Sequence, residues 1–272
     1  MAKASHVPAP IEDMITELPA ELMDVTEQDA GRGVSFKQED QLIPLIYVLQ
    51  TNSPIVDERG TSYIEGAKPG HFWLRNAIQP IADGEDGITV VPCGMQRTWI
   101  EWLPNRQGFV TRHMAVPEDL ETRVMRGDDG RERNVTVRGG NGNILQDTRE
   151  FYLLVEAGDS WQPYVFPCAG TKHSFAKQWQ SRYHQFRHPR TKQVLPSFSR
   201  KYLLTTVPQS NAQGKWFGLK FDDRGFIPVP LYNVASALND AMVKGEQRAE
   251  APMAQHTTEG TGATDLGDDI PF

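Results

Sequence analysis

Residues 151–186 read FYLLVEAGDSWQPYVFPCAGTKHSFAKQWQSRYHQF and place strand and helix patterns next to each other. Phe151–Glu156 and Tyr164–Pro167 are short runs rich in β-branched and aromatic residues, which predicts strands. From Lys172 to Phe186 the spacing changes to that of a helix. At ~100° per residue one narrow arc contains Phe175, Trp179, Tyr183 and Phe186. The segment therefore predicts two strands followed by an amphipathic helix whose aromatic stripe is buried.

Similar strand-like runs lie on both sides of this segment and are separated by Gly, Pro, Asn and Asp. They are 42–49, 72–78, 88–92, 98–103, 201–207, 216–221 and 226–229. Residues 104–149 are polar and Gly-rich and predict one or two long hairpin loops, whereas 231–243 predicts a second helix. Several strands with few helices predict an α+β domain, mainly of antiparallel β-sheet.

The charge of the chain is unevenly distributed. The formal net charge is -7, yet Ser160–Phe221 contains ten basic residues and no Asp or Glu. Charge of one sign gathered in one region is the electrostatic footprint of a polyanion site. The alternative is a solvated face whose acidic partners come from elsewhere in the fold.

Aromatic residues are interleaved with these basic residues, a combination that binds single strands through base stacking and phosphate contacts. Rings on strands are better stacking candidates than the helix stripe, because alternate strand residues share a face. Each ring can equally be a core residue. The predicted DNA-binding residues are Tyr164, Phe166, Lys172, Lys177, Arg182, Arg187, Arg190, Lys192, Arg200, Lys201, Lys215, Trp216 and Lys220.

Other classes of protein lack support in the sequence. No apolar run approaches the ~20 residues of a membrane span, and the first residues lack the apolar segment of a signal peptide. Two cysteines are too few for a disulfide scaffold, so we expect a cytoplasmic protein, in the host cell if it is phage-encoded. There is no Gly-Lys-Ser/Thr phosphate loop and no Gly-x-Ser-x-Gly elbow.

Metal chemistry is also not expected. His184 and His188 have the spacing of zinc ligands, but no Glu lies near them and neighbouring arginines oppose a cation. A magnesium nuclease needs clustered carboxylates, and the basic region has none. Acids elsewhere, such as Glu118, Asp119 and Glu121, could be brought in by the fold. We therefore expect no catalytic residues, metal or cofactor, without excluding a nuclease.

The chain ends in an acidic, apolar tip. The last eight residues read DLGDDIPF and follow a stretch rich in Thr, Gly and Ala. This tip resembles the C-terminal tip of phage and bacterial single-stranded DNA-binding proteins. The resemblance covers only these few residues, and the alternative is an ordinary acidic tail. It implies a protein-interaction site in which a pocket with a basic rim reads the terminus, formed by Asp268, Asp269, Ile270, Pro271 and Phe272.

The tip's relatives use the OB fold, so an elaborated OB-like barrel with one or two helices is the expected architecture, although another β-rich fold would fit the strand count. Three regions are expected. They are a disordered acidic N-terminal arm (1–35), an OB-like nucleic-acid-binding domain (36–244), and a flexible linker with the interaction tip (245–272).

The expected function is single-stranded DNA binding in phage-type replication, recombination or repair. The basic, aromatic groove would bind the strand, and the tip would recruit replication or recombination proteins. We expect no membrane partner, and a homo-oligomer is compatible with the sequence. Three alternatives remain: a recombination mediator or strand-annealing protein, a DNA-processing nuclease recruited by the same tail, and an inhibitory or virion protein that mimics the tail.

Overall fold

The computed structural model describes residues 42–74, 77, 79–104, 108–126, 132–138, 142–211 and 214–252, together with Ala20, Thr26 and Glu27. The chain divides into two units, Met1–Asp40 and Gln41–Phe272. All elements named below lie in the second unit. The C-terminal tip and nearly all of the predicted N-terminal arm lie outside the described residues.

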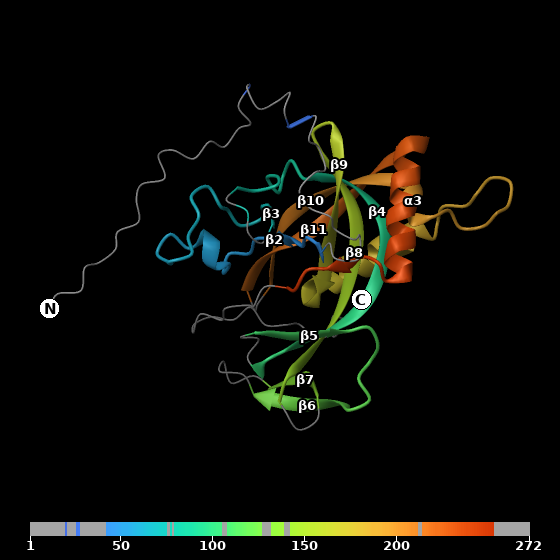
Figure 1. The fold of residues 1–272 in the computed structure, drawn as a ribbon. Coiled ribbons are helices and arrows are strands. Elements are labelled where there is room, and N and C mark those ends of the chain that lie inside the picture. Colours follow the sequence, from blue (N-terminus) through green and yellow to red (C-terminus); the bar gives the residue numbers. More distant parts are fainter. Residues whose placement is uncertain are drawn as a thin grey trace. The chain divides into compact units, whose positions relative to one another are not determined.

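The described residues form an α+β fold dominated by antiparallel strands, as the sequence predicts (Figure 1). The strands are β1 (Leu42–Ile43), β2 (Ile46–Val48), β3 (Phe72–Leu74), β4 (Ile88–Trp102), β5 (Phe109–His113), β6 (Leu120–Arg126), β7 (Glu132–Arg138), β8 (Ile144–Ala157), β9 (Ser160–Ala169), β10 (Arg200–Asn211), β11 (Gly214–Phe226) and β12 (Arg248–Ala249). The helices are α2 (His173–Tyr183) and α3 (Val229–Lys244). Two predicted strands, 88–92 and 98–103, are one long β4.

Within the described part, one sheet contains eight strands. Its path is β11-β10-β4-β8-β7-β6, with β5 also paired to β4 and β9 also paired to β8. The order β10-β4-β8-β9 is that of a Greek key, with β5–β7 inserted between its first two strands. The sheet is open, because β9 and β11 do not pair with each other in the described part of the chain. The described strands therefore form an open sheet and not a closed barrel, and the OB-like barrel expected from the sequence is not confirmed.

The segment around β2 contacts two edge strands of this sheet, β9 and β11. Leu45 forms a parallel bridge with Val165 of β9, and the Val165 amide donates to Pro44 O at 2.9 Å. At the other edge, the Gln50 side chain donates to Phe217 O at 3.2 Å and accepts from the Phe217 amide at 2.8 Å. These contacts hold the segment between β9 and β11 without completing a continuous ladder.

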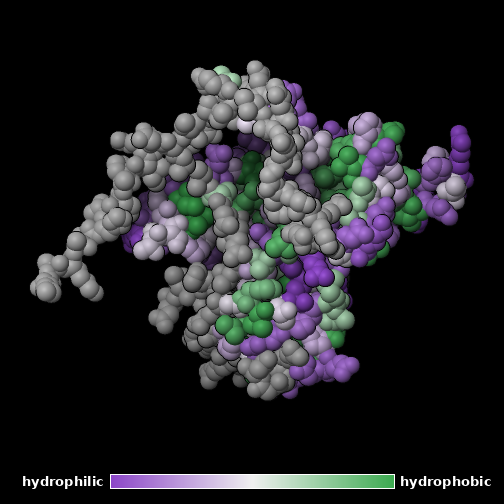
Figure 2. All heavy atoms as spheres, in the orientation of Figure 1, coloured by the Kyte–Doolittle hydropathy of each residue, from purple (hydrophilic) through white to green (hydrophobic). Residues whose placement is uncertain are grey.

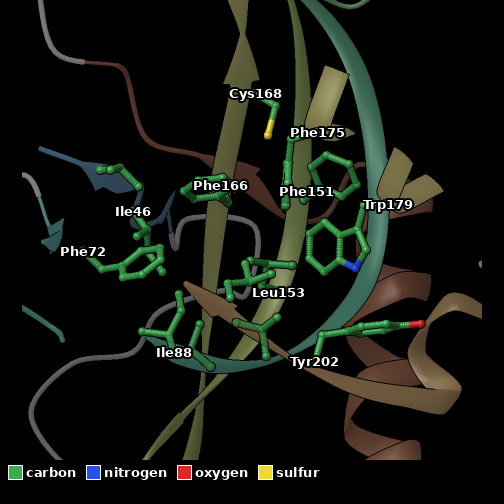
Figure 3. Packing of buried hydrophobic residues seen from close by; sticks show 14 of the residues in the cluster. Ile46, Phe72, Ile88, Phe151, Leu153, Phe166, Cys168, Phe175, Trp179 and Tyr202 are labelled. Carbon is green, nitrogen blue, oxygen red and sulfur yellow. The ribbon is translucent and has the colours of Figure 1, made fainter. Parts of the chain in front are cut away.

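The main core lies on the concave side of the sheet, where α2 packs against β8, β9 and β11 (Figure 3). Phe175 and Trp179 of α2 are buried, and Tyr183 packs against the same cluster. Trp179 is fully buried, with its ring 5.0 Å from Phe151 and 5.8 Å from Tyr202 between centroids. The predicted aromatic stripe is thus confirmed as core for these three helix residues.

Helix α3 covers the opposite face of β4 and β8. Leu231 and Ala235 of α3 are buried against Val91, Cys93 and Leu154. A register shift at Pro92/Gly94 interrupts the ladder with β8, and Asn239 of α3 donates to Cys93 O at 2.8 Å. The helix approaches closely at Gly94, since a Cβ there would lie 2.5 Å from the Met242 side chain.

The chain stays folded beyond α3, where the sequence predicted the start of the linker. Gly245 adopts φ 74° and its amide bonds Met242 O, which ends the helix in the left-handed conformation that glycine favours. Arg248–Ala249 then forms β12, parallel to β1. Arg112 of β5 donates to Ala249 O and Glu250 O at 2.9 and 3.0 Å. The linker assignment is therefore wrong for residues 245–250.

Residues 104–149, predicted as loops, contain the three strands β5, β6 and β7. Two buried carboxylates, Glu101 and Glu150, lie beside these strands. Glu150 lies 3.0 Å from Arg112, and burial raises the pKa of its carboxyl despite the nearby guanidinium. Glu101 accepts from Asn143 at 2.7 Å and contacts His113 Nε2 at 2.6 Å. These partners, which are far apart in sequence, compensate for part of the desolvation of the two carboxylates.

Candidate nucleic-acid interface

A short ordered arm, residues 186–195, follows α2 and projects from the domain (the gold loop beside α3 in Figure 1). Arg187 bridges Val194, and the Leu195 amide donates to Phe186 O at 3.0 Å. At the tip, His188 Nδ1 accepts from the amides of residues 190 and 191, each at 3.2 Å. The arm is a hydrogen-bonded turn, so its backbone has a defined conformation from which the side chains project.

The arm presents three exposed basic side chains, Arg187, Arg190 and Lys192. None of them forms an ion pair within the described residues, and Lys192 Nζ donates only to Pro189 O at 2.8 Å. Figure 2 shows the outer end of the arm as hydrophilic. Uncompensated cations on a rigid projection are suited to contacting a polyanion.

Arg182 and Arg200, predicted in the same set, have a different environment. Arg200 makes a two-pronged contact with Asp223, Nη2 to Oδ1 at 2.8 Å, and Arg182 lies 3.5 Å from the same carboxylate. Both guanidinium groups lie over the Phe186 ring, at 4.7 Å for Arg182 and 4.2 Å for Arg200. Asp223 lies two residues beyond the acid-free region, so the charge pattern could not reveal it.

The pairing also affects the pKa of Asp223. Partial burial opposes its ionisation, but hydrogen bonds from Arg200 and the Gly225 amide lower the pKa of the carboxyl below its ordinary value. The cluster joins α2, the base of the arm and the β10–β11 hairpin. Arg182 and Arg200 therefore help to hold the fold together, and the one carboxylate of Asp223 compensates one of their two positive charges.

The β10–β11 hairpin presents a second basic group. Lys215 is exposed, and Trp216 is half-buried opposite Gln209 of β10. Lys220 is exposed and lies 3.4 Å from Asp222, a weak surface pair. Lys201 is half-buried near the start of β10. Trp216 is thus a partly accessible ring next in sequence to an exposed lysine that has no ion pair with any described residue, and as neighbours on a strand the two side chains point to opposite faces.

A polar cleft of about 100 Å³ lies on the surface where α2 meets β11. Its polar lining comes from the turn before α2, from α2 and from β10, which sequence reasoning did not bring together: Thr171, Lys172, Ser174, Gln178 and Gln209. The Gln209 side chain packs closely over Gly218, since a Cβ at this position would lie 2.5 Å from it. Lys177 is exposed on α2.

Lys172 is the inner cation of this cleft. Its Nζ lies 5.3 Å from the centre of the Phe166 ring, and burial lowers the pKa of the amine. No carboxylate lies within ion-pair distance of it in the described part. A half-buried cation of this kind is positioned to accept an anion, but it is not a freely exposed charge.

Tyr164 and Phe166 face the core. Phe166 is fully buried and Tyr164 packs against the same cluster. Phe166 has no exposed ring face on which a base could stack, and Tyr164 is half-buried. Strand alternation correctly placed both rings on one face, but it could not show that this face is the inner one.

These observations define an α+β protein with an open Greek-key sheet and exposed basic groups on an arm and a hairpin. The family of Pam3 phage gp34-like proteins matches residues 13–248, and the chain belongs to this family. No curated protein and no solved structure matches the chain. Among the described helices, none is long and apolar enough to cross a membrane.

Proposed function

We propose that this protein binds single-stranded DNA in phage-type DNA replication or recombination. The observation on which this rests is the arm of residues 186–195, a hydrogen-bonded turn from which Arg187, Arg190 and Lys192 project without an ion pair to any described residue. The family name supports a phage origin. The acidic tip supports recruitment of replication or recombination proteins, because Phe272 and its carboxylate can be read together by a pocket with a basic rim.

The connectivity is compatible with an elaborated OB-like fold. The path β11-β10-β4-β8-β9 contains five strands, with α2 between β9 and β10, and an OB fold is a five-stranded, partly open Greek-key barrel. OB folds bind oligonucleotides on the face of their second and third strands. The equivalent strands here are β8 and β9, whose outer face packs against α3 and Ala249.

The strand would therefore bind elsewhere on this domain. The available basic groups are those of the arm, of α2 at Lys177, and of β11 at Lys215 and Lys220. Trp216 would supply stacking, which is tolerant of base identity. Arg182 and Arg200 would act indirectly, by holding the arm on the β10–β11 hairpin through Asp223.

The first experiment compares binding to single- and double-stranded oligonucleotides of equal length across a salt series, in the presence of Mg²⁺. Preferential binding of intact single strands supports the proposal. Shortened products would instead identify a nuclease, and accelerated pairing of complementary strands would identify an annealing protein. Absence of salt-dependent binding to any oligonucleotide would refute the proposal.

The second experiment locates the interface. Reversing all three arm charges (R187E/R190E/K192E) should weaken binding to every sequence alike and flatten the salt dependence by roughly 0.7 per lost phosphate contact, about 2 for three contacts. A matched control, R59E/K68E/K244E, makes the same change in net charge at exposed positions outside the basic region. Equal losses of salt dependence in the two variants would show that net charge, and not the arm, determines binding.

A further inference from the structure

The last strand at one end of the eight-stranded sheet, β6, has an open edge. It forms seven residue pairs with β7, from Leu120↔Arg138 to Arg126↔Glu132, and in the described part of the chain it pairs with no other strand (Figure 1). An edge strand exposes backbone donors and acceptors that can pair with another strand. Proteins usually block such edges with a proline, a bulge or charged side chains, lysine above all. Strand β6 contains no proline, lysine or bulge, and its charged residues carry both signs, which suits pairing with a strand of complementary charge.

The side chains of β6 are complementary to those of a second β6 in antiparallel orientation. If Thr122 lies on a two-fold axis, Glu121 of each copy faces Arg123 of the other, and Leu120 faces Val124. Opposite charges and apolar pairs directly across strands are stabilising. Moving the axis by one residue to Glu121 would place two glutamates face to face, and moving it to Arg123 would do the same with two arginines. The sequence therefore favours one register.

The exposure of these residues fits the same pairing. Val124 is 64% exposed, and a second strand paired with β6 would cover part of this apolar side chain. Arg123 is exposed and pairs with Glu121 of its own strand. The two charges thus lie side by side on one face of β6, where a partner strand would extend them into a four-charge cluster of alternating sign.

We propose that β6 is a homodimer interface, in which two copies of this chain pair their β6 strands antiparallel about Thr122 and form a continuous sheet. This interface is isologous, so each contact occurs twice. The occupant is a second copy because the charge pattern of β6 is complementary to itself. The proposal does not depend on the proposed DNA-binding function.

The test is the mass of the full-length protein measured by sedimentation over a concentration series. The wild-type chain should form dimers. Glu121→Lys and Arg123→Glu should each weaken dimerisation by about tenfold or more, because each places two like-charged pairs across the axis. Mixing the two variants should restore dimers. In the mixed dimer the introduced lysine of one chain faces the introduced glutamate of the other, and the native arginine faces the native glutamate in the second pair.

The exchanged variant E121R/R123E is the matched control, because it restores complementary pairs within one sequence and should dimerise like the wild type. Thermal unfolding of each variant, followed by circular dichroism, verifies that the monomer remains folded. A wild-type chain that is monomeric throughout the series would overturn the proposal. So would dimers that both single variants leave unchanged, or a mixture of the two variants that stays monomeric.

Discussion

The contact between Arg200 and Asp223 allows a quantitative prediction about how the base of the arm is held. The two side chains are only 15% and 16% exposed and are joined at 2.8 Å. Arg200 also lies 4.2 Å from the ring centre of Phe186 and 4.3 Å from that of Phe226. The pair is therefore less screened by solvent than a surface ion pair, and its removal should be measurable.

Arg200→Ala removes one charge-assisted contact and two cation–π contacts. A hydrogen bond to a charged group contributes about 1.5–3 kcal/mol and each cation–π contact about 0.5–1 kcal/mol. We expect Arg200→Ala to lower the free energy of unfolding by about 3 kcal/mol. Arg182, 3.5 Å from Asp223, remains to compensate part of the carboxylate charge. Arg200→Lys should recover little, because an ammonium cannot reproduce the two-pronged, stacked geometry.

The assay is chemical unfolding of Arg200→Ala, Asp223→Ala and the double variant, combined in a double-mutant cycle. We expect a coupling energy of about 1.5–2 kcal/mol, since directly contacting residues couple by about 0.5–3 kcal/mol. Arg190→Ala is the control, because an exposed arginine without an ion pair should change stability by less than about 0.5 kcal/mol. Additive effects of Arg200→Ala and Asp223→Ala would refute the assignment of Arg200 to the fold.

Four further predictions follow from the fold and the proposed interface. Trp216→Ala should cost ~1–3 kcal/mol of single-strand affinity by titration and leave the melting transition cooperative; loss of that transition would place the ring in the core. Trp179→Ala should lower the free energy of unfolding by about 3–5 kcal/mol, measured by denaturant titration, whereas a small change would contradict its central packing. The lowered pKa of Asp223 means that the unfolded chain takes up its proton first as the pH falls. The stabilisation that the Asp223 carboxylate contributes is therefore complete above the ordinary pKa of 3.8 and is lost as the pH falls below it. Asp223→Asn should be less stable than the wild type at neutral pH and should lose less stability in acid. Deleting residues 265–272 should reduce capture of replication proteins while DNA affinity stays equal or rises; adding one residue after Phe272 should be nearly as harmful, and equal recovery by the native and extended tails would contradict the proposed reading of the terminus.

Local pattern was sufficient for much of the secondary structure. The helix stripe Phe175, Trp179 and Tyr183 is core, and α3 lies where the spacing of 231–243 indicates. Pattern was insufficient where strands continue through residues that usually interrupt them. Strand β4 passes through Pro92 and Gly94 because a register shift and Asn239 of α3 accommodate the disrupted ladder. Residues 104–149 form strands beside buried carboxylates that are paired with distant residues.

The sequence by itself determined the α+β class, the aromatic face of α2 and the concentration of basic residues between 160 and 221, because composition and periodicity act locally. Only the tertiary structure decided which of those charges remain uncompensated. Asp223 pairs with Arg200 and Arg182 because the β10–β11 hairpin folds back onto α2, whereas Arg187, Arg190 and Lys192 project beyond any carboxylate of the described residues. Only the tertiary structure could likewise show that Phe166 is buried, because which face of a strand is buried depends on what packs against it.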